Sequence, residues 1–259
     1  MPIGIIKLSG LKITDPTRPV IADLSSKVKA ISSLYSWVTF DEDSVTLDAS
    51  GLIQAVTDQS GNGRGFAQAT AAYRPKWVDG VVNDRPVARF AGSAASSVFN
   101  RLDFTGALPS SGDLTKIAVL KLASTAGGVQ QILTDLVPAA TKHVLQVNNA
   151  TLQTANGNTS GNLSYPTALD ASAFHVVAGS QDFADKLARV KLDEGAVTSG
   201  AMTATGFNTT MYLGASETPT YPLAGDVAEV LVFNADLLAD AHADDLAAVM
   251  AYLQARFAI

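Results

Sequence analysis

The stretch Leu223-Ala-Gly-Asp-Val-Ala-Glu-Val-Leu-Val-Phe233 ends in seven residues that are almost entirely apolar, from Val227 to Phe233. Valine, leucine and phenylalanine are typical of β-strands, and the neighbouring glycine and asparagine are typical of strand ends. The stretch therefore predicts a strand near the end of the chain.

A helix is predicted after this strand. Its apolar face recurs at helical spacing, and charged residues suit its two ends. The residues of that face are Leu246, Val249, Met250, Leu253 and Phe257. Asp240 can cap the helix, Asp244 and Asp245 suit its positive end, and Arg256 suits its negative end. We expect this helix to pack on a β-sheet.

Toward the N-terminus, short runs rich in Val, Ile, Leu, Phe and Thr alternate with turn residues about every ten positions, which is typical of β-sandwiches. Clear examples are Ile117–Leu122, Gln131–Leu136, His143–Val147, Phe174–Gly179, Ala188–Leu192 and Met211–Leu213. Asp193-Glu194-Gly195 predicts a hairpin turn in which glycine takes a positive φ. Residues 148–162 form a long loop or an exposed hairpin. The pattern predicts an all-β fold, an antiparallel sandwich with a short N-terminal helix and a packed C-terminal helix.

The beginning of the chain differs in composition. Residues 1–22 contain three prolines among β-favouring residues, which favours an extended arm. Asp23 is a possible N-cap of a short helix whose apolar residues, ending at Tyr35, lie at helical spacing. They are Leu24, Val28, Ile31 and Tyr35. We expect an arm at 1–22 and one sandwich domain at 23–259.

Composition excludes several function classes. The net charge is -6 and no run of Lys and Arg occurs, so nucleic acid is not an expected partner. The absence of cysteine excludes disulfides and thiolate metal sites. Neither a Sec signal peptide nor about 18 consecutive apolar residues is present, so we expect a soluble chain without membrane insertion.

Two groups of motifs resemble concanavalin A-like lectin/glucanase (laminin G-like) domains of bacterial and bacteriophage proteins. The first group is Trp37-Val-Thr-Phe-Asp41, Ser44-Val-Thr-Leu-Asp48, Gly51-Leu-Ile53, Asp58-Gln-Ser-Gly-Asn-Gly63, Ala67–Ala71, Arg74-Pro75 and Asn83-Asp-Arg-Pro86 leading to Arg89-Phe90; the second is the 223–233 stretch with the terminal helix. The resemblance covers residues 36–259, and Val56 departs from it where such domains often have Trp. It implies a two-sheet antiparallel jelly-roll sandwich in which Gly61 and Gly63 form a tight turn and Asp58 bonds its own loop.

Catalytic patterns are missing. A retaining glucanase of this superfamily needs paired carboxylates on one strand face, as in Glu-x-Asp-x-x-Glu, and no such run occurs. Asp41 and Asp43 could share a face, whereas the spacing of Asp226 and Glu229 predicts opposite faces. His143, His175 and His242 are isolated, and no G-x-S-x-G is present. We therefore expect no enzymatic activity.

Calcium is the one cofactor that the sequence leaves open. Hard cations take carboxylate oxygens, and Asp41, Asp43 and Asp58 lie in predicted loops. Without an EF-hand or comparable spacing, solvated turn acids are the favoured interpretation.

Glycan binding is the remaining site hypothesis, because aromatic faces and Asn or Asp hydrogen bonds commonly hold sugars. Tyr165 and Tyr221 each precede a proline in a predicted loop, and Asn156, Asn158 and Asn162 lie near Tyr165 in sequence. Trp37 and Trp77 fit packing roles better.

Three functions follow in order of preference. The first is a non-enzymatic structural or adhesion module of a bacteriophage virion, as a decoration, fibre or tail component that assembles through residues 1–22. Its expected partners are other virion or surface proteins, copies of itself and cell-surface polysaccharide. The alternative is a stand-alone carbohydrate-binding lectin, and a glycoside hydrolase is least favoured.

Overall fold

The computed structural model describes residues 21–259 except 93–98, 110–111, 136–142, 157–161, 204–205, 207 and 217–220. Its helices are α1 (Ile21–Ala30) and α2 (Ala243–Phe257), with short 3-10 turns η1 (Ala71–Tyr73) and η3 (Asp240–His242). Within the described ranges, no helix is both long and apolar enough to cross a membrane.

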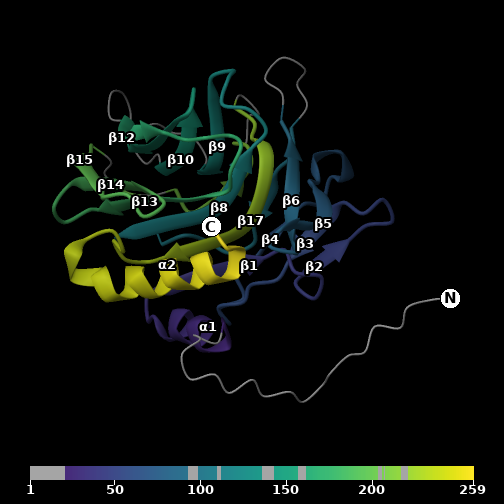
Figure 1. Cartoon of the computed structure of the whole chain (residues 1–259), viewed down its shortest axis with the longest axis horizontal. Coiled ribbons are helices and arrows are strands. Elements are labelled where there is room, and N and C mark those ends of the chain that lie inside the picture. Colours follow the sequence, from purple (N-terminus) through teal and green to yellow (C-terminus); the bar gives the residue numbers. More distant parts are fainter. Residues whose placement is uncertain are drawn as a thin grey trace.

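The strands form two antiparallel sheets (Figure 1). Sheet A has the order β15-β14-β13-β8-β17-β6-β5, with β1 also paired to β17, and sheet B has the order β12-β11-β10-β9-β16-β7-β4-β3-β2. Sheet A contains β1 (Leu34–Thr39), β5 (Lys76–Val82), β6 (Arg85–Ala91), β8 (Leu114–Leu122), β13 (His175–Asp182), β14 (Leu187–Leu192), β15 (Thr198–Ala201) and β17 (Ala224–Phe233). Sheet B contains β2 (Val45–Leu47), β3 (Ile53–Val56), β4 (Phe66–Ala67), β7 (Leu102–Phe104), β9 (Val129–Thr134), β10 (His143–Asn148), β11 (Thr151–Asn156), β12 (Asn162–Ala168) and β16 (Tyr212–Leu213). The predicted two-sheet jelly-roll sandwich is confirmed.

The central strand β17 is buried on both faces. Val227, Val230 and Val232 pack between the two sheets, whereas Leu231 and Phe233 pack against the helices. Both helices lie against sheet A (Figure 1). Side chains of α1 such as Leu24 and Val28, and the apolar face of α2, pack there. This double burial explains why the end of the 223–233 stretch is almost continuously apolar rather than alternating.

The predicted ends of both helices need correction. Tyr35 belongs to β1, so the helical spacing from Leu24 to Tyr35 overestimates α1, and Asp23 lies inside the helix. Residues 21 and 22 also belong to α1, while residues 1–20 of the expected arm lie outside the described part. Asp240 begins η3 without a side-chain cap, and the N-cap of α2 is His242. Tertiary packing of β1 overrides its helical pattern.

The turn after β14 is present, but its chemistry differs from the prediction. Asp193, not Gly195, has the positive φ, at 47°. A Cβ on residue 195 would lie 1.9 Å from the hydroxyl oxygen of Tyr165, so glycine is required there by a close approach. Within residues 148–162, strand β11 pairs with β10 on one side and with β12 on the other. Of the two predicted forms, a long loop or an exposed hairpin, the hairpin is therefore the correct one.

We expect Gly214→Ala to lower the free energy of unfolding by roughly 3 kcal/mol, because it combines left-handed strain with overpacking. Gly214 has φ 93°, and an added Cβ would lie 2.3 Å from the ring of Phe90. Gly51→Ala is the matched control, since φ there is 75° with open space around the Cβ, and it should cost about 1 kcal/mol. Equal losses in urea denaturation would show that the Phe90 contact relaxes freely.

Candidate functional site

A row of polar side chains crosses four strands of sheet B, and we call Gln131, Gln146, Gln153 and Ser164 the amide row. Gln146 is the cross-strand partner of both Gln131 and Gln153, and Gln153 is the partner of Ser164. The Gln146 amide donates to Gln153 Oε1 at 3.1 Å, and the Gln153 amide donates to Ser164 Oγ at 3.0 Å. These bonds hold the amide planes in defined orientations.

The amide row lies on the face of sheet B that points away from sheet A. Leu145 and Val147 flank Gln146 and both lie in the core between the sheets, as does Leu152 beside Gln153. Because side chains alternate along a strand, the glutamines point to the opposite face. Both α1 and α2 pack on sheet A instead, so neither covers the amide row (Figure 1).

The amide row is open at its two ends. At one end, the backbone carbonyl of Tyr221 accepts a hydrogen bond from Gln131 N at 2.9 Å, and the Tyr221 side chain is 45% exposed. At the other end, Asn162 and Ser164 are exposed, and the Asn162 amide lies 3.4 Å from Gln153 Oε1. The three glutamines between are at most 9% exposed.

The amide row offers both hydrogen-bond donors and hydrogen-bond acceptors. Gln131 Oε1 is buried and has no hydrogen-bond partner within the described part of the chain. Amides can donate and accept at once, which suits ligand hydroxyl groups, and the exposed Tyr221 is joined to Gln131 through their backbones. The arrangement can bind a polyhydroxylated ligand without any bond-breaking chemistry.

The five glycan-binding candidates separate in space. Tyr221 and Asn162 lie at opposite ends of the amide row. Tyr165, in contrast, is only 7% exposed in β12 and packs into the core, so its predicted position on a rim loop is wrong. Asn156 is the last residue of β11, and Asn158 lies outside the described residues. Strands β10 and β11 separate β12 from β9, where Tyr221 is bound.

The carboxylate oxygens of Asp58 already accept hydrogen bonds from neighbouring residues of the protein. Its Oδ1 accepts from the backbone N–H of Trp37 and Ser60 at 2.9 Å each, and its Oδ2 accepts from Arg64 N at 2.9 Å and Ser60 Oγ at 2.7 Å. The predicted Asx turn is thereby confirmed, with Gly61 and Gly63 at positive φ in the same loop. Four donors leave this carboxylate little capacity for calcium.

Asp41 and Asp43 have different partners. Asp41 forms ion pairs with Arg85, at 3.4 Å, and with Arg256, so the prediction of a merely solvated turn acid is wrong for Asp41. Asp43 Oδ1 accepts from Ser44 Oγ at 3.3 Å. No group of three acidic or histidine side chains that could hold a metal occurs among the described residues.

A register shift corrects the prediction for Asp226 and Glu229. The pairing of β17 with β8 is irregular between Val227 and Glu229, which changes the alternation of side chains. Asp226 forms a two-bond ion pair with Arg89, and Glu229 faces α2. Both carboxylates therefore lie on the helix-covered side of sheet A, not on opposite faces.

Glu229 is fully buried and has three polar partners. Trp37 Nε1 donates to Oε1 at 2.6 Å, Tyr252 OH donates to Oε2 at 3.3 Å, and Arg256 Nε lies 2.8 Å from Oε2. Burial raises the pKa of Glu229 to about 7, against the opposing effect of the Arg256 charge. With no exposed surface, this carboxylate cannot act on a substrate directly, and it serves to attach α2 to sheet A.

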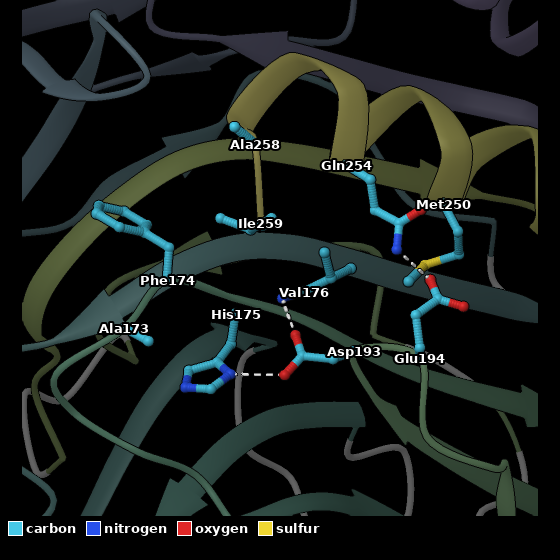
Figure 2. A pocket seen from close by; sticks show the side chains of 10 residues that line it. All are labelled: Ala173, Phe174, His175, Val176, Asp193, Glu194, Met250, Gln254, Ala258 and Ile259. Carbon is cyan, nitrogen blue, oxygen red and sulfur yellow. Dashed lines mark hydrogen bonds and ion pairs between the residues drawn. The ribbon is translucent and has the colours of Figure 1, made fainter.

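Figure 2 shows a pocket of about 490 Å³ between the end of α2 and the start of β13. Its apolar wall includes Val176 and Met250, and its polar wall includes His175, Asp193 and Glu194. The Gln254 amide donates to Glu194 Oε1 at 2.7 Å across the pocket. A hydroxyl or thiol nucleophile is missing from the residues that line it.

The histidine of this pocket is held at both ring nitrogens. His175 Nδ1 lies 2.7 Å from Asp193 Oδ2, and Nε2 lies 2.8 Å from the carbonyl oxygen of Asp170. The hydrogen bond to Asp193 raises the pKa of His175, because two acceptors favour the doubly protonated ring. Neither nitrogen is available as a general base, so the His–Asp pair acts as a structural clamp.

A second histidine lies inside the sandwich. His143 is fully buried in β10, and its carbonyl oxygen accepts from Lys116 Nζ at 2.7 Å, while its N–H donates to Asp135 at 2.9 Å. Burial lowers the pKa of His143 well below its ordinary range and lowers that of Lys116 to about 8, with Asp135 opposing the lysine shift. These groups have no access to solvent, so they form part of the core.

The glutamines were not found by sequence reasoning. Gln146 lies between Leu145 and Val147, and Gln153 follows Leu152, so the period of two was visible as a signal for one polar face. The strand pairing that aligns the glutamines across β9, β10 and β11 could not be read from this alternation. The packing roles predicted for Trp37 and Trp77 are confirmed: Trp37 is 3% exposed, and Trp77 packs against the core.

Several solved structures share this fold. Domain 4 of AbnA, a GH43 extracellular arabinanase from Geobacillus stearothermophilus, solved in complex with arabinotriose, has a TM-score of 0.57 at 17% identity, over 83% of this chain and 98% of that chain. Botulinum neurotoxin type C, whose cell entry is described as dependent upon interaction with two ganglioside molecules, has a TM-score of 0.53 at 10% identity, over 86% and 52%. The heptameric SAP-like pentraxin from Limulus polyphemus has a TM-score of 0.50 at 15% identity, over 62% and 80%.

No family model matches the sequence, and neither does any curated protein. At these low identities the structural likeness shows a shared jelly-roll sandwich, consistent with the concanavalin A-like fold.

Asp193→Asn should lower thermal stability more at pH 5.5 than at pH 8.5. The raised pKa of His175 means that its contribution to stability is fully present below the unfolded-state value of about 6.5 and is lost as pH rises through the folded-state value. Asparagine tolerates the positive φ and can still accept from Val176 N, so the variant removes mainly the charge. A melting-temperature difference independent of pH would exclude this ion pair as the cause.

Proposed function

We propose that this chain is a non-catalytic glycan-binding module that uses the amide row and Tyr221. The observation that carries the proposal is the alignment of Gln131, Gln146 and Gln153 across three strands, with Gln146 and Gln153 hydrogen-bonded to each other and Gln131 bonded through its backbone to the exposed Tyr221. Fixed amides and an aromatic face match the two surfaces of a sugar, its hydroxyl edge and its apolar ring face. The buried position of the glutamines restricts direct contact to the two open ends of the row.

The described carboxylates support a binding role over hydrolysis. Glycoside hydrolysis requires two carboxyl groups on either side of the scissile bond, one of them able to donate a proton. Glu229 has the raised pKa of an acid catalyst, but it is enclosed between sheet A and α2. Asp226 is held by Arg89. A hydrolase therefore stays the least favoured alternative.

Tyr221→Ala should weaken glycan binding about three- to tenfold, which corresponds to the loss of one stacking contact. Arabinotriose and a ganglioside oligosaccharide are reasonable first probes beside a glycan array, because proteins of this fold are described with them. Gln153→Ala should weaken binding at the other end of the row. Affinities would be measured by isothermal titration calorimetry, with circular dichroism to verify folding.

Gln54→Ala is the matched control, because Gln54 is an exposed glutamine on β3 of the same sheet, away from the amide row. Its affinity should equal that of the parent protein. Binding that survives Tyr221→Ala and Gln153→Ala together would place the glycan elsewhere, and no binding to any glycan would refute the function.

A role in a bacteriophage virion is a separate proposal, which rests on the resemblance and on the proline-containing residues 1–20 before α1. We expect the full chain to form oligomers and a version lacking residues 1–20 to be monomeric, as determined by size-exclusion chromatography with light scattering. Monomers in both cases would contradict assembly through the arm, without affecting the glycan proposal.

A further inference from the structure

A small polar pocket lies where α1, α2 and the turn after β1 meet, separate from the amide row and from the pocket in Figure 2. Its volume is about 220 Å³, below the roughly 300 Å³ at which drug-sized pockets begin, so it suits one small ring. It is lined by Lys29 from α1, Trp37 and Thr39 from β1, Asp43 from the turn and Tyr252 from α2, among others. Segments far apart in the sequence therefore build one site.

The aromatic wall of this pocket is held rigidly. Trp37 and Tyr252 contact each other edge to face, with ring centroids 5.3 Å apart, and both donate hydrogen bonds to the buried Glu229. Arg256, which also lines the pocket, is bound between Glu229 and Asp41. Fixed side chains lose little conformational entropy when a ligand binds.

The pocket lining also carries a chain of hydroxyl and amide groups. Thr39 Oγ1 and the Gln59 amide both donate to Ser44 Oγ, at 3.1 and 3.2 Å, and Ser44 donates to Asp43 Oδ1 at 3.3 Å. In the described part of the chain, no cation lies within ion-pair distance of Asp43. A carboxylate with free acceptor capacity suits ligand hydroxyl groups.

Lys29 supplies a positive charge that is not neutralised by a described carboxylate. Its ammonium lies 5.8 Å from the centroid of the Trp37 ring, and none of the ion pairs in the described residues involves it. The charge of Arg256, by comparison, is balanced by Asp41 and Glu229. Lys29 is therefore the group with which an anionic ligand would pair.

We propose that this pocket binds a single acidic sugar, whose carboxylate pairs with Lys29 and whose hydroxyls bond to Asp43 and its neighbours. Trp37 and Tyr252, which are 3% and 2% exposed, form the rigid base of the pocket beneath the ligand. The proposal does not depend on the amide row, and the paired acids Asp41 and Asp43 acquire distinct roles, one as the partner of Arg256 and the other as a ligand contact.

The test is a titration of the full-length, isotopically labelled protein with galacturonate and, separately, with galactose, observed through the indole N–H signals in nuclear magnetic resonance. Trp77 lies outside this pocket and serves as the internal reference. Galacturonate should shift the Trp37 signal and leave Trp77 unchanged, and galactose, which lacks the carboxylate, should bind roughly tenfold more weakly.

Lys29→Met keeps most of the apolar stem and removes the charge, so it should reduce galacturonate affinity to that of galactose. Lys27→Met, an exposed lysine of the same helix that does not line the pocket, should change nothing. Asp43→Asn should weaken both sugars. Tyr221→Ala should leave this binding intact, which separates it from the amide row.

Three outcomes would overturn the proposal. They are the absence of any Trp37 shift with millimolar galacturonate, equal affinities for the two sugars, and an affinity unchanged by Lys29→Met. Stronger binding of glycine than of galacturonate would instead assign the pocket to small zwitterions and would equally refute an acidic-sugar site.

Discussion

Burial of β17 on both faces is the constraint on which the rest of the structure depends. One face of this strand meets sheet B across the sandwich, and the other meets α1 and α2. Apolar area removed from water on two sides contributes the main stabilising free energy, so sheet A has to lie in the middle of the molecule. Sheet B then has one face that neither helix covers, and the amide row lies on it.

The layer of helices also buries a charged group, Glu229, and supplies polar partners for it. Glu229 lies beneath α2, where an unpaired charge would be costly, and hydrogen bonds from Trp37 and Tyr252 together with the charge of Arg256 compensate it. The same contacts hold Trp37 and Arg256 in the wall of the small polar pocket. A structural contact between layers thus supports a proposed binding surface. The His175–Asp193 pair, in turn, joins the start of β13 to the turn after β14.

Local patterns identified most elements, and the errors have a physical cause in each case. The strands and the helix α2 were predicted correctly because their hydrophobic patterns reflect which faces are buried. A strand or helix with one buried face has a periodic pattern, and a strand with two has a continuous one. Tyr35 was assigned to a helix because its spacing is compatible with both structures, and pairing of β1 with β17 decided between them. The prediction that Asp226 and Glu229 lie on opposite faces of their strand was wrong, because the bulge between them has no clear signature in the local sequence. Tyr165 resembled a loop residue only because a proline follows it.

The sequence by itself determined the two-sheet sandwich, the terminal helix and the Asx turn at Asp58, because hydrophobic periodicity and turn chemistry act over a few residues. Only the tertiary structure decided which polar groups meet. Gln131, Gln146 and Gln153 lie on separate strands, and Lys29 and Asp43 lie on either side of β1. Their proximity depends on strand order, register and the angle at which the helices pack, which are set by the whole core and not by neighbours in the chain.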